Sequence, residues 1–267
     1  MILDRIVQTK REEVAARKMA VPLRELKARI RDLPSPRDFH RALDRRSHGG
    51  RIRLIAEVKR ASPSQGVIRE PFDLDQVTQA YVAAGAAALS VLTDEPFFQG
   101  SLDDLARVKA SVSLPVLRKD FIVDPYQVYE TRASGGDAVL LIVAALERQF
   151  LQDLLALSHE VGLYPLTEVH TREELQTALG VKVPIVGINN RDLKTFRVSL
   201  ETTFSLLPEI PPERVVVSES GISDHAEVAR LAAAGVDAIL VGEGLLRAQD
   251  VERKVRDLLG MGHGGSR

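Results

Sequence analysis

The sequence predicts an α/β protein, a single (β/α)8 TIM barrel preceded by an N-terminal helical extension. From residue 53 onward, eight short apolar runs alternate with amphipathic stretches, at a spacing of roughly 20 to 35 residues that suits this barrel. The runs are rich in Val, Ile and Leu on both faces, which is typical of parallel strands covered on both sides. A doubly wound sheet is the alternative, but its usual glycine-rich dinucleotide or phosphate turn does not occur.

The first part of the chain, residues 1–52, predicts helices rather than strands. A third helix is expected to start at Ser35-Pro36-Arg37-Asp38, with a capping box and a proline at its first position. We expect these helices to pack against the barrel, over one of its two mouths, and not to form a separate domain. Apolar residues keep helical spacing in two stretches, Leu3, Ile6, Val7 and Val14, and then Leu23, Leu26, Ile30 and Leu33.

The barrel itself is expected to occupy residues 53–260, followed by a disordered tail at 261–267. Ser101 and Ser223 are candidate N-caps, and Thr171 with Glu174 predicts a capping box. The predicted strands are 53–59, 88–94, 115–121, 137–143, 163–169, 184–191, 214–220 and 237–243. Glycines expected to end helices in a left-handed conformation are Gly85, Gly135, Gly162, Gly180 and Gly235.

The composition indicates a globular protein of the cytoplasm. The 267 residues are 45% hydrophobic and 27% charged, which is too apolar for a disordered chain. No apolar run approaches the roughly 18 to 20 residues of a membrane span, and the charged start argues against a secretory signal. The absence of Cys excludes a disulfide framework and a cysteine nucleophile. The six His show no metal-ligand spacing, so we expect no metal. Because no apolar run is long enough to span a membrane, we also expect no membrane partner.

Basic residues are concentrated near the N-terminus. Residues 1–53 hold 15 Lys and Arg against 7 Asp and Glu, a balance of +8, whereas the rest holds 21 against 30, or −9. The basic residues are interspersed with acidic ones and lack interleaved aromatics, which favours solvated helix faces over a nucleic-acid-binding arm. Steering of an anionic small molecule is compatible with either interpretation. We therefore expect no nucleic-acid partner.

Charged and amide side chains stand at the carboxyl ends of five predicted strands. Because every second side chain of a barrel strand points inward, these groups are expected to converge on one mouth. The alternative to a catalytic site is an ion network that only fills the barrel. We favour the catalytic site, because catalytic groups of this architecture lie at the carboxyl ends of the strands. Such a cluster favours acid–base catalysis, with pKa values pushed apart and a lysine tuned to donate a proton near neutrality. The groups are Glu57, Lys59, Lys119, Glu168, Asn189, Arg191 and Glu219.

Two glycine turns predict a phosphate site at the same mouth. Ser220-Gly221 follows the seventh strand, and Gly242-Glu243-Gly244 follows the eighth and leads into a short helix. The loops after strands seven and eight, with a helix N-terminus, are the usual phosphate cradle of these barrels. Ser62 and Ser64 are candidates for additional hydroxyl donors from the first loop.

Five segments, one at each of these strand ends, resemble the signature segments of the indole-3-glycerol phosphate synthase family, and the resemblance covers essentially the whole chain. It implies a tryptophan-pathway lyase that closes the ring of 1-(2-carboxyphenylamino)-1-deoxyribulose 5-phosphate with loss of carbon dioxide and water. It also implies that no cofactor or metal is used. Association with other enzymes of the pathway is a further expectation, which the resemblance does not itself imply. The segments are AEVKRASPS (56–64), LRKDFI (117–122), LTEVH (166–170), GINNRD (187–192) and SESGI (218–222).

The resemblance also implies roles for single residues. Lys119 resembles the general acid that protonates the sugar carbonyl, and Glu168 resembles the acid/base residue of the later dehydration. Glu57 and Lys59 match a pair that contacts the anthranilate portion and the reacting hydroxyl, and Lys59 is itself a candidate second acid. Gly244 departs from the serine expected in many bacterial members, which leaves phosphate binding there to backbone N–H groups.

The other predicted site residues are implied to hold the substrate. Asn189 and Glu219, counted with the catalytic set, match positioning residues, as does Arg191. Phe98 and Phe121 match aromatics around the substrate ring. The phosphate-binding residues implied are Ser62, Ser220, Gly221, Gly242 and Glu243.

Three alternative functions remain open from the residues alone. One is phosphoribosylanthranilate isomerase, although that enzyme is expected to use a cysteine base and this chain has none. Another is a Schiff-base aldolase that uses Lys119 or Lys59. The third is a barrel that binds sugar phosphates or RNA without catalysis.

Overall fold

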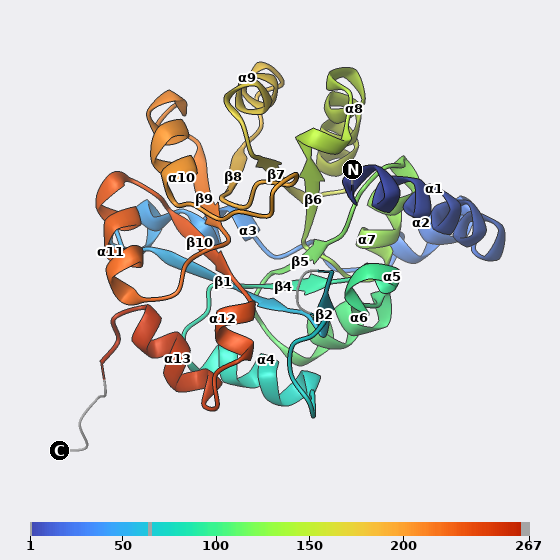
Figure 1. Ribbon diagram of the computed structural model, residues 1–267. Helices are drawn as coiled ribbons and strands as arrows, with labels where there is room; N and C mark the ends of the chain where they lie inside the picture. The colour runs from blue at the N-terminus through green and yellow to red at the C-terminus, as the bar shows by residue number, and fades with distance from the viewer. Residues whose placement is uncertain (1, 64–65, 263–267) are drawn as a thin grey trace.

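The structure, a computed structural model, describes residues 2–63 and 66–262, and it confirms the predicted TIM barrel. All neighbouring barrel strands are parallel, and β1 closes the ring by pairing with β10, with Ile55 opposite Leu240. Figure 1 shows the helices placed around the ring of strands. The barrel strands are β1 (Arg53–Val58), β4 (Ala88–Leu92), β5 (Val116–Lys119), β6 (Ala138–Ile142), β7 (Tyr164–Val169), β8 (Ile185–Asn189), β9 (Val215–Glu219) and β10 (Ala238–Val241).

Most of the connecting segments are helices, as βαβ units require. A small hairpin of β2 (Ala61–Ser62) and β3 (Gly66–Val67) stands in the first loop. The longer helices are α4 (Leu74–Ala83), α6 (Leu102–Ser111), α7 (Pro125–Ala133), α8 (Arg148–Glu160), α9 (Arg172–Gly180), α10 (Glu201–Leu206), α11 (His225–Ala234) and α13 (Val251–Leu258). The short ones are α5 (Glu95–Phe98), η2 (Val143–Ala145), η3 (Leu207–Glu209) and α12 (Glu243–Leu246).

The hydrophobic core has two layers because strand residues alternate between the inside of the barrel and the surrounding helices. Inside the barrel, Leu117, Leu140, Leu166 and Val217 pack together and are fully buried. The outward-facing residues of the same strands pack against the helices in two further clusters. The inner layer fills the lower part of the barrel and leaves its carboxyl end to polar residues.

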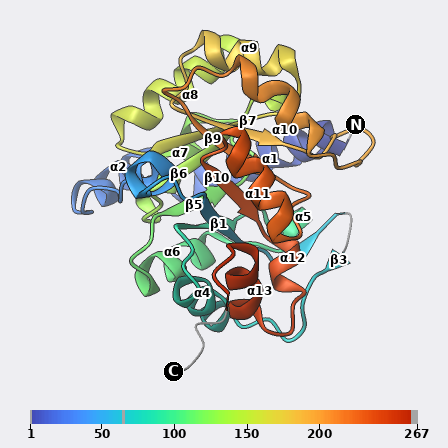
Figure 2. The same ribbon diagram turned by 90° about the vertical axis from the view of Figure 1, so that its left-hand side faces the viewer.

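The N-terminal helices pack on the barrel, as predicted, but they are not confined to one of its mouths. α1 (Ile2–Ala20) and α2 (Leu23–Arg31) lie beside α7, where Val14, Leu26 and Tyr126 form an apolar cluster. α3 (Phe39–Leu43) and η1 (Arg45–His48) lie at the amino ends of the strands, and Phe39 and Leu43 close the barrel core there. The segment therefore runs from one end of the barrel to the other, as the side view in Figure 2 shows.

Three predicted helix starts have different outcomes. Ser101 caps α6, because its hydroxyl accepts the N–H of Asp104 at 3.0 Å. Ser223 was the wrong N-cap, since the neighbouring Asp224 carboxylate accepts the N–H of Glu227 at 2.9 Å. The helix expected from Ser35 begins only at Phe39, where Asp38 is the N-cap.

Two predictions about α9 are corrected. Thr171 is its N-cap, but the Glu174 carboxylate accepts the N–H of His170 instead of completing the capping box. Gly180 is the last residue of the helix and is not left-handed; Lys182 takes that conformation, with φ 60°. The other predicted helix-ending glycines do have positive φ, namely Gly85, Gly135, Gly162 and Gly235.

Two sequence predictions fall wholly or partly outside the described residues. Ser64 is one, and most of the tail predicted to be disordered, residues 263–267, is the other. The described residues include no helix with the length and apolarity needed to cross a membrane.

Candidate active site

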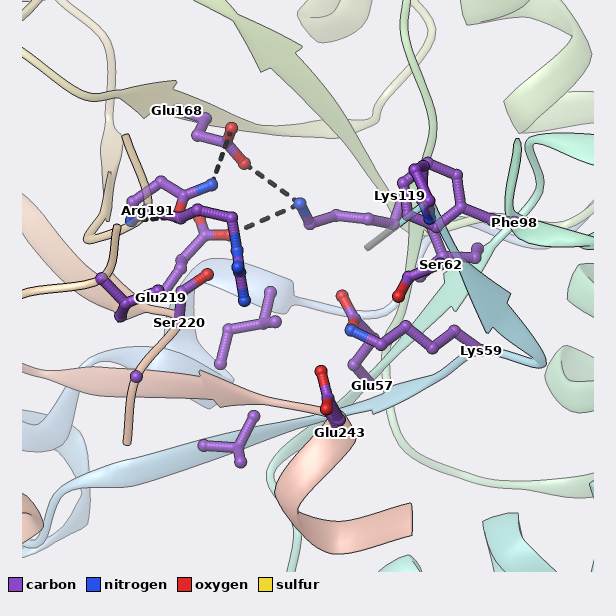
Figure 3. Close-up of a pocket in the computed structure, with 18 of the residues that line it drawn as sticks. Glu57, Lys59, Ser62, Phe98, Lys119, Glu168, Arg191, Glu219, Ser220 and Glu243 are labelled. Carbon is purple, nitrogen blue, oxygen red and sulfur yellow. Dashed lines mark hydrogen bonds and ion pairs between the residues drawn. The ribbon is translucent and has the colours of Figure 1, made fainter. Parts of the chain in front are cut away.

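A cavity of about 450 Å³ opens at the carboxyl ends of the barrel strands. Its size is within the usual range for a small-molecule site. Figure 3 shows side chains from β1, β5, β7 and β9 pointing into it. All fourteen residues that the sequence singled out line it, namely Glu57, Lys59, Ser62, Phe98, Lys119, Phe121, Glu168, Asn189, Arg191, Glu219, Ser220, Gly221, Gly242 and Glu243.

Lys119, at the end of β5, is the centre of the polar cluster. Its Nζ lies 3.0 Å from Oε2 of Glu168 and 3.6 Å from Oε2 of Glu219. Burial opposes the charge of Lys119, but the carboxylates of Glu168, Glu219 and Glu57 outweigh it and raise the pKa of the lysine. The expectation of a lysine tuned toward neutrality is therefore not met here, because the surrounding carboxylates keep Lys119 protonated.

Glu168 and Glu219 face the same lysine but have opposite electrostatic environments. Burial disfavours the Glu168 carboxylate, yet Lys119 and His170 lower its pKa, and the amide of Asn189 donates to its Oε1 at 3.2 Å. Burial and the Glu168 charge raise the pKa of Glu219. Among the described residues neither Glu219 oxygen accepts a hydrogen bond. The site thus pairs a stable carboxylate with one that binds a proton more readily.

Glu57 and Lys59 form a second acid–base pair on β1. Their Nζ and Oε1 atoms are 2.6 Å apart, and both side chains face the cavity. Gly242 leaves room for this pair, because a Cβ there would collide with the Glu57 carboxylate. Gly187 does the same on β8, where a Cβ would collide with Glu219. Gly187 had no predicted role, although its inward position beside a strand-end carboxylate was a usable signal in the sequence.

The rim beside β9 and β10 combines a tight glycine turn with the start of a short helix. Ser220 and Gly221 both have positive φ, 67° and 81°, and turn the backbone toward the cavity. A side chain at Gly221 would collide with Val198, which explains the glycine. α12 begins at Glu243, and the first N–H groups of a helix have no partner within the helix. Ser62 adds a buried hydroxyl with no hydrogen-bond partner among the described residues.

The opposite part of the cavity is apolar. The rings of Phe98 and Phe121 lie 6.3 Å apart, and the first turns of α1 contribute Leu3 and Ile6. The loop after β8 contributes Phe196, which is 43% exposed. From the sequence, the α1 residues were predicted only as helix-packing positions, and Phe196 had no predicted role. A large aromatic residue within a polar loop was the available signal.

A second cluster of buried charges lies on the outer side of β5. Arg118 is fully buried and pairs with Asp120 and Glu130, each at 2.9 Å. Lys10 of α1 lies 2.9 Å from Asp94 and 3.0 Å from Asp120. Burial alone would raise the pKa of Asp120, but Arg118 and Lys10 lower it. This cluster ties α1 and α7 to the loops after β4 and β5.

Across residues 2–63 and 66–262, no three His, Asp or Glu side chains are grouped in a way that could hold a metal ion.

Comparison with known proteins gives close relatives over nearly the whole chain. Residues 3–258 match the family model described as indole-3-glycerol phosphate synthase. A protein of that name from Burkholderia ambifaria is 54% identical over 249 residues, which cover 92% of this chain and 94% of the relative. One from Dehalococcoides mccartyi is 51% identical over 262 residues, covering 97% of this chain and all of the relative.

Solved structures that resemble the chain share its fold at low identity. 3-Hexulose-6-phosphate synthase from Salmonella typhimurium matches with a TM-score of 0.64 and 12% identity, covering 78% of this chain and 97% of that one. N-Acetylmannosamine-6-phosphate 2-epimerase from Clostridium perfringens matches with a TM-score of 0.61 and 15% identity, covering 85% and 99%. At these identities the likeness shows the barrel fold alone.

Proposed function

This chain belongs to the indole-3-glycerol phosphate synthase family, and from that premise we propose how its site residues share the reaction. The activity is that of a carboxy-lyase of tryptophan biosynthesis acting on a phosphorylated small molecule. Ring closure of 1-(2-carboxyphenylamino)-1-deoxyribulose 5-phosphate, with loss of carbon dioxide and water, gives indole-3-glycerol phosphate. The family assignment decides against the isomerase, the aldolase and the non-catalytic barrel.

In the proposed ring closure, Lys119 is the general acid. The aromatic carbon attacks the sugar carbonyl, a carbon–carbon bond forms, and the carbonyl oxygen takes the lysine proton. The observation that carries this proposal is the buried ammonium group of Lys119, held between Glu168 and Glu219 in the cavity. An ammonium group with a raised pKa is fully charged, and it stabilises an oxyanion before and during proton transfer.

The remaining steps are proposed to use Glu168 and Lys59. Loss of carbon dioxide leaves its bonding electrons in the ring and restores aromaticity. Lys59 then protonates the departing hydroxyl to give water, while Glu168 accepts a proton from the substrate. Because Glu168 lies 3.0 Å from Lys119, it can return that proton to the lysine directly. Lys59 takes one proton from solvent, which balances the charge lost with the carboxylate.

Two anchors are proposed to hold the substrate bent for ring closure. The rim at Ser220, Gly221 and Glu243 receives the phosphate through backbone N–H groups, and Ser62 adds its hydroxyl. Arg191 lies at the mouth of the cavity beside this rim. Phe98 and Phe121 pack around the aromatic portion of the substrate. Fixing both ends of a flexible chain lowers the entropic part of the barrier.

The test is turnover of the carboxyphenylamino-deoxyribulose phosphate, followed by indole absorbance and fluorescence. Lys119→Ala should lose about 10²- to 10⁴-fold in kcat, as expected for a general acid, with substrate binding retained. Lys119→Arg should also fail, because guanidinium does not readily release a proton. Glu168→Gln should lower kcat more than it changes KM. Near-normal turnover of Lys119→Ala would rule out its role as the acid.

We also propose that the enzyme acts in the cytoplasm, without a nucleic-acid partner, and associates with other enzymes of tryptophan biosynthesis. The composition and the mixed charges of residues 1–53 support the first two points, and the family assignment supports the third. Co-elution with a purified enzyme of the pathway in size-exclusion chromatography would support the association. Elution at the same volume with and without each candidate enzyme would argue against it.

A further inference from the structure

His170 contacts Glu168 from outside the cavity. It directly follows β7, and its side chain is only 7% exposed. Its ring Nε2 lies 3.3 Å from Oε1 of Glu168, and its Nδ1 lies 3.1 Å from Oε2 of Glu174 on α9. The same Glu174 oxygen accepts the backbone N–H of His170 at 2.7 Å. The imidazole is therefore held between two carboxylates, one in the cavity and one outside it.

This geometry favours an imidazolium. Nδ1 is hydrogen-bonded to the Glu174 carboxylate, and Nε2 lies at ion-pair distance from Glu168 without a hydrogen bond among the described residues. A neutral imidazole has one N–H group and one lone pair, so one of its nitrogens would face a carboxylate without a proton. Burial opposes a charge on the ring, but contacts with Glu168 and Glu174 raise the pKa of His170 to about 10.

The charged groups around His170 are few among the described residues. Glu168 comes from β7 and Glu174 from α9, while Lys119 of β5 and Glu219 of β9 lie beyond Glu168. β8 contributes the neutral amide of Asn189, and η2 has no titratable side chain. His170 is thus one of two cations in contact with Glu168, and Lys119 is the other.

The proposed reaction leaves one of these two cations neutral. When Lys119 gives its proton to the carbonyl oxygen, Glu168 loses the positive charge that lies 3.0 Å away. Burial then raises the pKa of Glu168 with less opposition, since Lys119 is the largest of the contacts that lower it. A Glu168 that took up a proton at this point could no longer act as the base of the dehydration.

We propose that His170 is a positioning residue for this reaction, which keeps Glu168 ionised and oriented while Lys119 is neutral. The inference rests on the proposed role of Glu168 in the dehydration. The proton stays on His170 throughout, so no bond is made or broken at the ring. Glu174 acts one step further out, because it holds the ring in its charged form and fixes its orientation.

The first test is His170→Asn, which keeps an N–H donor but removes the charge. We expect kcat to fall about 10- to 100-fold, the usual loss for such supporting contacts, with KM within twofold of wild type. The matched control is Glu173→Gln, an exposed glutamate beside Glu174 on the same helix, which should leave kcat and KM unchanged. Thermal unfolding of each variant separates misfolding from a change at Glu168.

The second test is the pH dependence of Glu174→Gln. This variant keeps an oxygen for the backbone N–H but loses the negative charge, so the pKa of His170 should fall toward its ordinary 6.5. Since the imidazolium is lost as the pH rises through that pKa, kcat should match wild type at pH 6 and fall between pH 7 and 9. The wild-type enzyme should hold this part of its activity to about pH 10. His170→Asn/Glu174→Gln should show no such fall.

Nitrogen NMR of the ¹⁵N-histidine-labelled protein reports the ring directly, and an imidazolium at pH 7.5 is expected. A neutral ring at that pH, or wild-type kcat in His170→Asn at every pH, would overturn the inference. Glu168→Gln, assayed in parallel, separates a failure of the proposed role of Glu168 from a failure of the proposed role of His170. If it keeps full turnover, the proposed role of Glu168 is wrong; if it fails while His170→Asn stays active, only the role of His170 is wrong.

Discussion

The two faces of β5 carry two clusters of buried charge that differ in how they are paired. On the outer face, Arg118 and Asp120 belong to a network whose oppositely charged atoms lie about 3 Å apart. On the inner face, Lys119 is shared by Glu168 at 3.0 Å and Glu219 at 3.6 Å, and this is the only ion pair of Glu219 among the described residues. Three consecutive residues thus serve a network of short ion pairs and a more loosely paired one.

This difference separates stabilising charges from reactive ones. A buried ion pair is costly to break once formed, because removal of one partner leaves the other uncompensated. A carboxylate left short of partners instead has a raised pKa and is ready to interact with a substrate. A network of short ion pairs lies behind the strand, while the mouth combines the pairs of Lys59 with Glu57 and Lys119 with Glu168 with the more loosely paired Glu219.

The largest expected effect comes from exchanging one residue on each face for methionine. Arg118→Met should lower the free energy of unfolding by about 3 to 5 kcal/mol, because Asp120 and Glu130 stay buried without their cation. Its kcat per folded molecule should stay within a fewfold of wild type. Lys119→Met should do the reverse, with kcat lost and a smaller loss of stability, since its carboxylates face an open cavity. Urea unfolding and turnover of both variants check this.

The comparison would fail if Arg118→Met lost turnover while keeping its urea midpoint. Arg29→Met is a suitable control, because both side chains of its ion pair with Glu25 are exposed. A surface pair of this kind is expected to contribute at most about 1 kcal/mol.

A smaller effect is expected from Glu219→Gln, and it depends on pH. A glutamate whose pKa is raised by folding contributes stability below its unfolded pKa, and this contribution is lost as the pH rises through the folded value. The variant should therefore match wild type near pH 4 and exceed it by on the order of 1 to 3 kcal/mol at pH 9. Asp120 has the opposite sign, because its lowered pKa makes stability fall as the pH drops.

Urea titrations of wild type and Glu219→Gln at several pH values measure the difference. Equal stability at pH 9 would show that Glu219 is no less well compensated than the outer network.

The smallest effect is expected from Gly187→Ala, which adds one methyl group on the inner side of β8. Its Cβ would displace the Glu219 carboxylate without touching the outer network. We expect a kcat loss of up to about 10²-fold, since displacements near 1 Å can have that effect. Gly262→Ala, where no atom lies within 4 Å of the added Cβ and φ is not positive, is the control for the substitution itself. Unchanged kcat in Gly187→Ala would mean that the position of Glu219 does not matter.

Much of the site could be predicted because strand alternation is a short-range rule. It placed Glu57, Lys119, Glu168 and Glu219 on the inside of the barrel, and the structure brings them together. The outer network could not be predicted in this way, since Lys10 comes from a helix far away in the sequence. Alternation does put Arg118 on the outer face, but it does not identify the partners that make such burial acceptable.

The contact between His170 and Glu168 was missed for a related reason. The segment LTEVH shows both residues on the same side of a strand, but the role of the histidine depends on Glu174 at the start of α9. The sequence predicted that Glu174 would complete a capping box with Thr171. In the structure it binds the residue before the N-cap, which is a difference of one position that helix propensity does not resolve.

The pairing of β1 with β10 has a consequence for how the protein is made on the ribosome. The strand at residues 53–58 is synthesised early, yet one of its two neighbours ends at Val241. At the usual 5 to 20 residues per second, the interval is roughly 10 to 40 s. During that time one edge of the nascent sheet has no partner strand, and unpaired edges invite intermolecular association. The N-terminal helices are synthesised first, but they pack at the two ends of the finished ring. They therefore do not cover the free edge of β1, which is paired only when β10 is made.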